Sequence, residues 1–277
     1  ALRRIGEKAL RDIFVRLKRD RVGRHDLYKA GAFGDKDEAT KKYQFGDRFD
    51  VHLQRTLMNA LGRQGPGVPV SVAPDDFEVY RSENLTRSAT VVLLDQSRSM
   101  GYMGSFQAAK RVALALYTLI ETAFPRDSLY VLGFSEYAHE IKRGELPEAA
   151  WNAWVPGTNM HHALVLSRQL LARHKGGTRQ VILITDGEPT AHLENGQAYF
   201  SYPPSYETIR QTLLEVKRCT REGIVINTFM LETSYYLMDF INQLTKINKG
   251  RAFYTTPDKL GQYIMVDYIT NKRKRIG

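Results

Sequence analysis

The feature that most limits the fold of this chain is a regular alternation of apolar runs and helix-like segments from about residue 88 onward. The runs ATVVLLD (89–95), VILIT (181–185) and IVINTFML (224–231) have few polar interruptions. Amphipathic segments lie between them, such as SFQAAKRVALALYTLIETAF (105–124). Strands that are apolar on both faces and joined by helices form a parallel sheet covered on both sides. We therefore predict an α/β fold with a doubly wound, mostly parallel sheet flanked by helices.

The N-terminal part of the chain has a different pattern. A helix over residues 2–18 is predicted by apolar residues three and four positions apart: Leu2, Ile5, Ala9, Ile13 and Leu17. Its apolar stripe needs a cover, so we expect the helix to dock on the main domain. Residues 19–49 are polar and are expected to lack regular structure, and a second helix is predicted over 50–62. We therefore predict a mainly helical N-terminal extension, residues 1–75, followed by the α/β domain, residues 76–277.

The composition is that of a globular protein, with 277 residues, of which 43% are hydrophobic and 25% charged. The net charge of +10 favours an acidic partner, such as nucleic acid or an acidic protein. Cys219 is the only cysteine, which excludes a disulfide within the chain and is typical of a reducing cytoplasm. No apolar run is long enough to span a membrane. Because the chain begins ALRRIGEK without Met, we expect its natural start to lie upstream.

Oxygen-bearing side chains follow two of the apolar runs. Asp95 ends VVLLD, and Ser97 and Ser99 follow at alternate positions, while Asp186 comes directly after VILIT. Ligands of doubly wound folds bind beyond the carboxyl ends of the strands, at the topological switch point. If the two strands are neighbours there, these side chains converge, and Thr158 before a later helix supplies a third hydroxyl. Carboxylates and hydroxyls are hard ligands, which predicts a site for Mg²⁺, with Mn²⁺ as the alternative.

The ordered motifs Asp-x-Ser-x-Ser, Gly-Thr-Asn and Thr-Asp-Gly resemble those of the von Willebrand factor A (vWA) domain, over roughly residues 75–277. The resemblance implies a Rossmann-like vWA fold and a metal-ion-dependent adhesion site (MIDAS) at the matching positions: Asp95, Ser97, Ser99, Thr158 and Asp186. Two features depart from the family pattern. Arg98 stands where many members have a small residue, and either favours an acidic ligand or points to solvent. The long segment 191–206 is expected to be a lid or a contact loop.

The motifs DQSRSM and TDGEPTAH are similar to those of the intracellular bacterial branch of the vWA family. That branch includes the metal-chelatase D-subunit type and the proteins that work beside MoxR-type AAA+ ATPases. The resemblance implies a cytoplasmic protein, and the hydroxyl-rich site without a general acid, base or activated nucleophile indicates a non-catalytic binding subunit. This subunit would bind an Asp or Glu side chain of a protein partner through bound Mg²⁺. The partner would be an AAA+ ATPase or that ATPase's client.

Two other functions stay open on the sequence alone. The net charge is compatible with a nucleic-acid-binding protein on a vWA scaffold, and two carboxylates with Mg²⁺ are compatible with a metal-assisted hydrolase. Ser97 or Ser99 with His161 or His162 would resemble a nucleophile and its base, although packing is the favoured interpretation of the two histidines. No P-loop and no G-x-S-x-G motif occurs in the chain. Trp151 and Trp154 are expected to form a small apolar plug behind the loop that leads to Thr158.

Overall fold

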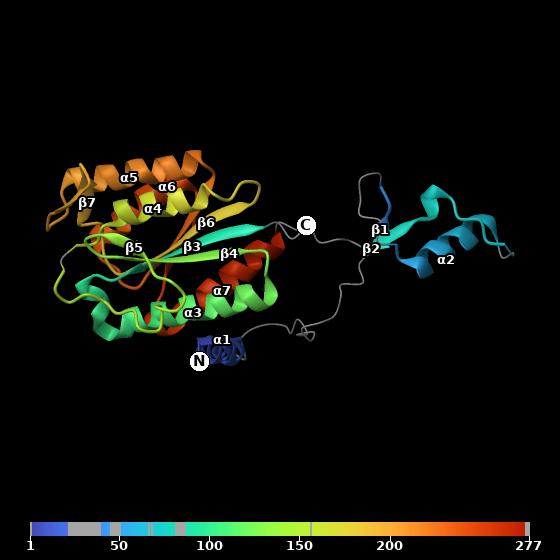
Figure 1. Cartoon of the computed structure of the whole chain (residues 1–277), viewed down its shortest axis with the longest axis horizontal. Helices are drawn as coiled ribbons and strands as arrows, with labels where there is room; N and C mark the ends of the chain where they lie inside the picture. The colour runs from blue at the N-terminus through green and yellow to red at the C-terminus, as the bar shows by residue number, and fades with distance from the viewer. Residues whose placement is uncertain are drawn as a thin grey trace. The chain divides into compact units, whose positions relative to one another are not determined.

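The protein consists of two compact units, which we describe separately (Figure 1). The larger unit joins residues 1–23 to residues 86–275, and the smaller contains residues 24–85. The structure is a computed structural model, which describes the following residues: 2–21, 40–44, 51–65, 67, 69–80, 87–155 and 157–274.

One six-stranded sheet organises the larger unit, with the strand order β10-β9-β6-β3-β4-β5. Neighbouring strands run parallel, except that β5 is antiparallel to β4. The strands are β3 (Ser88–Asp95), β4 (Ser128–Phe134), β5 (Ala138–Glu140), β6 (Thr178–Thr185), β9 (Ile224–Met230) and β10 (Ala252–Tyr254). The predicted doubly wound, mostly parallel sheet is confirmed.

Helices cover both faces of this sheet (Figure 1). One face is covered by α3 and α7, with α1 outside them, and the other by α4, α5 and α6. Successive side chains of β3 alternate between the two cores, so that Val92 and Leu94 face α3 while Val91 and Leu93 face α4. The helices are α1 (Leu2–Arg21), α3 (Ser105–Ala123), α4 (Met160–Leu171), α5 (Tyr206–Arg221), α6 (Tyr235–Asn248) and α7 (Pro257–Lys274). None of the described helices combines the length and the apolar character that crossing a bilayer requires.

The topological switch lies between β3 and β6. The chain leaves β3 through α3 to β4 on one side and returns through α4 to β6 on the other side. β3 and β6 are directly paired, with Leu94 opposite Ile184 near their carboxyl ends. The adjacency on which the convergence of the two acids depends is therefore present, and the loops after the two strands start side by side.

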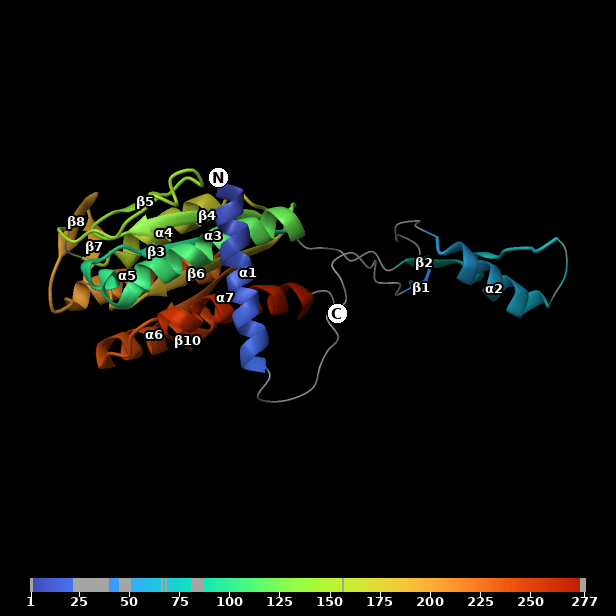
Figure 2. The same cartoon turned by 90° about the horizontal axis from the view of Figure 1, so that it is seen from below.

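Helix α1 docks on the larger unit, as its apolar stripe predicted. It lies across α3 and α7 (Figure 2), and Ala9 is buried there. α1 lies close to both helices. A Cβ added to Gly6 would lie 2.0 Å from the Thr118 hydroxyl of α3, and a Cβ added to Gly261 of α7 would lie 2.8 Å from Ile13. This packing assigns α1 to the larger unit, whereas the sequence predicted one extension over residues 1–75.

The smaller unit, predicted as mainly helical, contains a helix on a two-stranded sheet. β1 (Thr40–Lys42) pairs antiparallel with β2 (Glu78–Tyr80), and α2 (Leu53–Gln64) and a short 3₁₀ helix (Pro74–Asp76) accompany them. The Arg63 guanidinium donates to both carboxylate oxygens of the buried Asp76. Most of the segment 19–49, predicted without regular structure, lies outside the described residues, but β1 falls within it. The predicted boundary at residue 75 falls inside this unit.

The close approach of α1 to α3 gives a first prediction. Gly6→Ala should destabilise the larger unit by about 1–3 kcal/mol, because overpacking outweighs the gain of about 1 kcal/mol in helix propensity. The Thr118 hydroxyl donates a hydrogen bond to the Leu114 carbonyl at 3.2 Å, and rotating the hydroxyl away from the added methyl group would break that bond. Urea unfolding and hydrogen exchange of α1 measure the effect. Gly62→Ala in α2 is the matched control, since nothing lies within 4 Å of its added Cβ. Unchanged exchange in α1 would contradict the close packing.

Candidate functional site

Asp95 is the last residue of β3 and is completely buried. One carboxylate oxygen accepts a hydrogen bond from the Ser97 backbone N–H at 2.8 Å. The other accepts from the hydroxyl of Thr185, the last residue of β6, at 2.6 Å. The carboxylate is therefore oriented by its own loop and by the neighbouring strand. Thr185 was missed in the sequence, although it directly precedes the acid of the motif TDG.

A chain of hydrogen bonds connects the loop after β3 to the loop after β6. The hydroxyls of Ser97 and Ser99 lie 3.1 Å apart, and the Ser99 hydroxyl donates to an Asp186 carboxylate oxygen at 2.8 Å. Asp186 and Ser97 are buried, whereas Ser99 is exposed. The structure thus brings together Asp95, Ser97, Ser99 and Asp186, and the cluster opens to solvent at Ser99.

Thr158 is tied to the site through its main chain. Its N–H donates to the Thr190 hydroxyl at 2.9 Å, and its carbonyl accepts from the Thr190 N–H at 3.2 Å. Thr190 belongs to the same loop as Asp186, so the two loops are held together. The next residue, Asn159, caps α4 by accepting from the His162 N–H. These bonds position Thr158 beside the Asp186 loop, and its role as a ligand stays a prediction.

The two carboxylates make this a site of high electrostatic energy. Burial raises the pKa of Asp95 to about 6, against the bonds from Ser97 and Thr185 that lower it. Burial, together with the negative charges of Asp95 and Glu232, raises the pKa of Asp186 to about 7, against the hydrogen bond from Ser99 that lowers it. A cation between the two carboxylates would relieve both the burial and the repulsion.

The chemistry of the cluster fits a hard divalent cation. Its donors are carboxylate and hydroxyl oxygens, which magnesium and manganese prefer over softer metals. Among the described residues, no group of three or more His, Cys, Asp or Glu side chains is arranged to hold a metal. A cation at this site would therefore depend on the serine and threonine hydroxyls as much as on the two acids.

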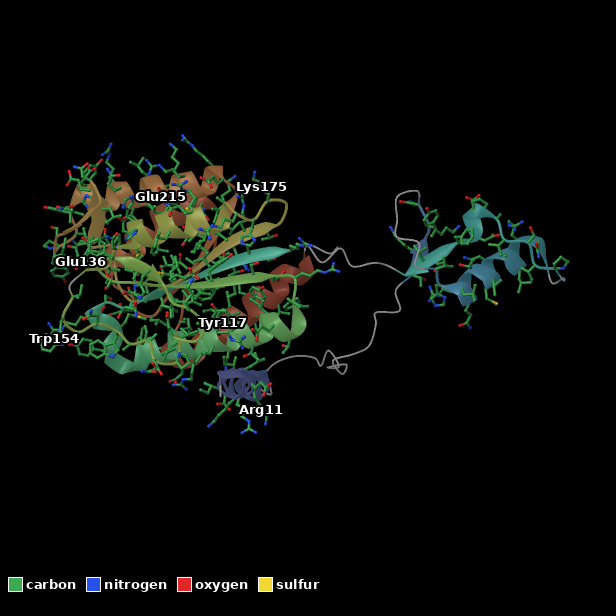
Figure 3. The ribbon with its side chains drawn as sticks, viewed as in Figure 1. Arg11, Tyr117, Glu136, Trp154, Lys175 and Glu215 are labelled. Carbon is green, nitrogen blue, oxygen red and sulfur yellow. The ribbon has the colours of Figure 1, made fainter. Side chains whose placement is uncertain are left out.

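The loop that precedes Thr158 is anchored on the end of β3. The Gln96 side chain donates to the Ala150 carbonyl at 2.6 Å, and the Gln96 carbonyl accepts from the Asn152 N–H. The Trp151 ring packs against Gly101, where a Cβ would lie 2.6 Å from the ring. Trp154 is 90% exposed. Trp151 therefore packs on the loop after β3 but stays 38% exposed, and the predicted plug is wrong for Trp154, whose ring stands at the surface (Figure 3).

The segment 191–206 contains a β-hairpin, formed by β7 (Ala191–Glu194) and β8 (Gln197–Phe200). His161 on α4 accepts a hydrogen bond from the Leu193 N–H at 3.1 Å, and the buried His192 bonds to the Thr208 hydroxyl at 3.0 Å. His162 likewise accepts from the Ala138 N–H at 3.1 Å. The histidines of α4 thus hold surrounding loops, which supports the packing interpretation over a role as a catalytic base.

The comparison with protein families decides the assignment. The family model described as "Rv0959-like protein, vWA domain" matches residues 88–269, and the model "Rv0959-like protein, third domain" matches residues 33–82. The chain belongs to the vWA family of Rv0959-like proteins. The two matches correspond to the two units of the structure, with α1 added to the vWA domain.

Curated relatives occur in mycobacteria. The chain is 38% identical over 281 aligned positions to the uncharacterized proteins Rv0959 of Mycobacterium tuberculosis (strain H37Rv) and Mb0984 of Mycobacterium bovis. The alignment covers 99% of this chain and 42% of each relative. The chain thus spans less than half the length of the curated relatives that it matches.

Solved structures share the fold of the vWA domain. The pilus adhesin SpaC of Lactobacillus rhamnosus GG has a TM-score of 0.54 at 18% identity, covering 70% of this chain and 31% of its own. A mutant of the minor pilin PilB of Streptococcus sanguinis has a TM-score of 0.55 at 14% identity, with coverages of 72% and 64%. BatB of Bacteroides thetaiotaomicron has a TM-score of 0.50 at 15% identity, with coverages of 68% and 99%. At these identities the likeness shows the fold alone.

The raised pKa values predict how stability depends on pH without metal. Because the folded-state pKa of Asp186, about 7, exceeds the unfolded value, the folded state binds its proton more tightly, and stability falls as pH rises through 7. Asp186→Asn keeps an acceptor for Ser99 and removes the charge. In EDTA we expect the melting temperature of this variant to lie several degrees above that of the wild type at pH 8. A change of roughly 1 kcal/mol in the free energy of unfolding shifts the melting temperature of such a domain by about 2–4 °C. The difference should shrink toward pH 5.

Differential scanning calorimetry at several pH values measures this difference. Asp239→Asn, which removes an exposed carboxylate on α6, is the control and should show no such dependence. A difference between Asp186→Asn and the wild type that is equal at pH 5 and pH 8 would rule out the raised pKa.

Proposed function

We infer that this vWA domain is a metal-dependent protein-binding module. The observation that carries this proposal is the hydrogen-bonded cluster of Asp95, Ser97, Ser99 and Asp186, which places two mutually repelling carboxylates beside an opening to solvent. Such a cluster is suited to hold a divalent cation and to leave one coordination position for an outside group. The group supplied by the partner would be an Asp or Glu carboxylate.

Each residue of the cluster would have a distinct part in holding Mg²⁺ or Mn²⁺. The hydroxyls of Ser97, Ser99 and Thr158 are proposed as direct ligands, and Asp95 and Asp186 balance the charge of the cation. Both oxygens of Asp95 already accept hydrogen bonds, which fixes its orientation. When bound, the metal supplies a Lewis-acid position for a carboxylate. Because Ser99 is the exposed member, the outside ligand approaches on its side.

Binding is favoured over catalysis by the surroundings of the cluster. Asp95 is completely buried and doubly hydrogen-bonded, so it is poorly placed to exchange protons with a substrate. His161 and His162 use their Nδ1 atoms to hold backbone N–H groups of neighbouring loops. We therefore propose a non-catalytic subunit, and a metal-assisted hydrolase is the weaker candidate.

For the partner we propose an AAA+ ATPase of the MoxR type, or its client, in the bacterial cytoplasm. The support is the similarity of the DQSRSM and TDGEPTAH motifs to that branch of the family and the single, buried cysteine, Cys219. The protein would then serve as an adaptor for ATP-driven remodelling or for a chelatase-like complex. Pull-down of the ATPase encoded nearest to this protein, with Mg²⁺ and with EDTA, tests the pairing. Capture that is unaffected by EDTA would contradict a metal-bridged contact.

Titration calorimetry tests the metal site itself. At pH 8 the wild type should bind one Mg²⁺ or Mn²⁺, and Asp186→Ala and Ser99→Ala should each weaken binding about tenfold or more, because each removes an oxygen from a site with few charged ligands. Asp239→Asn should bind as the wild type does. Circular dichroism checks that the variants stay folded. A wild type that binds neither metal, or variants that bind as tightly as the wild type, would remove the basis of the proposed function.

A further inference from the structure

Exposed aromatic side chains gather on the loops that surround the candidate metal site. They come from segments far apart in the sequence, each at the carboxyl end of the sheet: Tyr102, Tyr137, Trp154, Tyr202, Tyr206 and Tyr235. Trp154 is 90% exposed and Tyr206 is 83% exposed. Large aromatic side chains are normally at least partly covered in a monomer, and their concentration at one end marks an interaction surface.

Hydrogen bonds hold these loops at the carboxyl end of the sheet. The Tyr137 hydroxyl accepts from the Ala198 N–H of the hairpin, and Trp154 N–H donates to Asn152 of the loop anchored on Gln96. Tyr102 follows Ser99 on the loop after β3. These aromatic residues therefore lie on loops at the same end of the sheet as the candidate metal site, and Tyr102 shares a loop with Ser99.

Carboxylates accompany the aromatic residues on three of these loops. Glu136 lies in the turn after β4, whose backbone packs beside Gly157, and Trp154 and Glu136 stand at the same end of the unit (Figure 3). Glu188 is two residues after Asp186 and accepts from Ser234, and Glu232 is close enough for its charge to act on Asp186. Arg98 is an exposed cation on the loop after β3. These three glutamates give the rim of the metal site a negative character, although the whole chain carries a net charge of +10.

We propose that this rim docks a protein segment in which one carboxylate is flanked by lysine or arginine. The inference rests on the proposed function, because the carboxylate would complete the metal site. The flanking cations would meet Glu136, Glu188 and Glu232, and their apolar stems would pack on the rings of Trp154 and its neighbours. The partner is thereby specified as a mixed-charge segment.

The charge balance of the site favours this occupant over a purely acidic one. Asp95 and Asp186 together offset the charge of a divalent cation, so the loaded site has little net charge to attract an acidic segment from a distance. An acidic segment would place several negative charges against the glutamates of the rim, and like charges across an interface oppose binding. A segment with one carboxylate and basic flanks satisfies the metal and the rim together.

The two tryptophans of the chain allow a direct test with a built-in probe. Trp151→Phe keeps an aromatic ring against Gly101 and leaves Trp154 as the sole tryptophan. Short synthetic peptides are titrated into this variant of the full chain with excess Mg²⁺ and with EDTA. The peptides differ only in the central residue, Glu or Gln, and in the flanks, which are basic, acidic or uncharged. We expect the Glu-centred peptide with basic flanks to bind about tenfold more tightly than the one with acidic flanks. Its binding should shift Trp154 emission to the blue.

The outcomes separate this inference from the proposed function. If Glu-centred peptides bind only with Mg²⁺ but with the same affinity whatever the charge of their flanks, the inference is overturned and the proposed metal site still stands. Binding that persists in EDTA, or with Gln at the centre, would overturn the proposed function too. Binding of no peptide would overturn the docking surface, while calorimetry with metal alone still tests the metal site.

Two sets of variants test the parts of the rim. The triple variant Glu136→Gln, Glu188→Gln and Glu232→Gln should lose the preference for basic flanks and still bind Mg²⁺. Trp154→Ala should weaken the favoured peptide about tenfold, as expected for a central aromatic contact. Tyr263→Ala on α7 removes an exposed aromatic residue away from the rim and should have no effect. A triple variant that keeps the preference, or a Trp154→Ala variant with unchanged affinity, would refute the assigned role.

Discussion

The parallel pairing of β3 with β6 is the interaction on which the site depends. Every residue of β3 is buried, because helices cover both faces of the sheet and strands flank both edges of β3. Asp95 is the last residue of that strand and is buried with it. A buried carboxylate needs hydrogen-bond partners, and Thr185 at the end of β6 supplies one only because the strands are neighbours in this register. The same pairing places Asp186 next to this carboxylate and creates the repulsion that a cation would relieve.

The loops around the site are held by contacts that do not use the side chains of the proposed ligands. Thr190 fixes the backbone of Thr158, Gln96 fixes the loop before it, and His161 fixes the hairpin β7–β8. Because these tethers do not require a metal, they would hold the loops in place before a cation binds. Binding energy from a cation or a partner would then not be spent on ordering the site. Such an arrangement is consistent with the proposed binding module.

The sheet and the converging acids could be predicted from the sequence because they follow from local patterns. Apolar runs such as VVLLD define strands, and in a parallel sheet the residue after each run lies at the same edge. The contacts that could not be predicted join loops distant in the sequence, such as Trp151 on Gly101 and Thr158 with Thr190. The docking position of α1 depends likewise on a close approach at Gly6, which periodicity does not reveal. The exposure of Trp154 was misjudged because an isolated tryptophan has no periodic pattern that indicates its environment.

The electrostatics of the site show why net charge alone is a poor guide to a partner. The whole chain carries a charge of +10, which taken alone favours an acidic macromolecule. Around the site, however, burial raises the pKa of Asp186 to about 7, and the neighbouring negative charges of Asp95 and Glu232 contribute to that rise. At distances of a few ångströms such local charges outweigh a diffuse excess, which salt screens over about 8 Å. A partner that approached through the candidate site would therefore meet the potential of the loops around it. A diffuse basic excess would act mainly on the rate of encounter and on solubility.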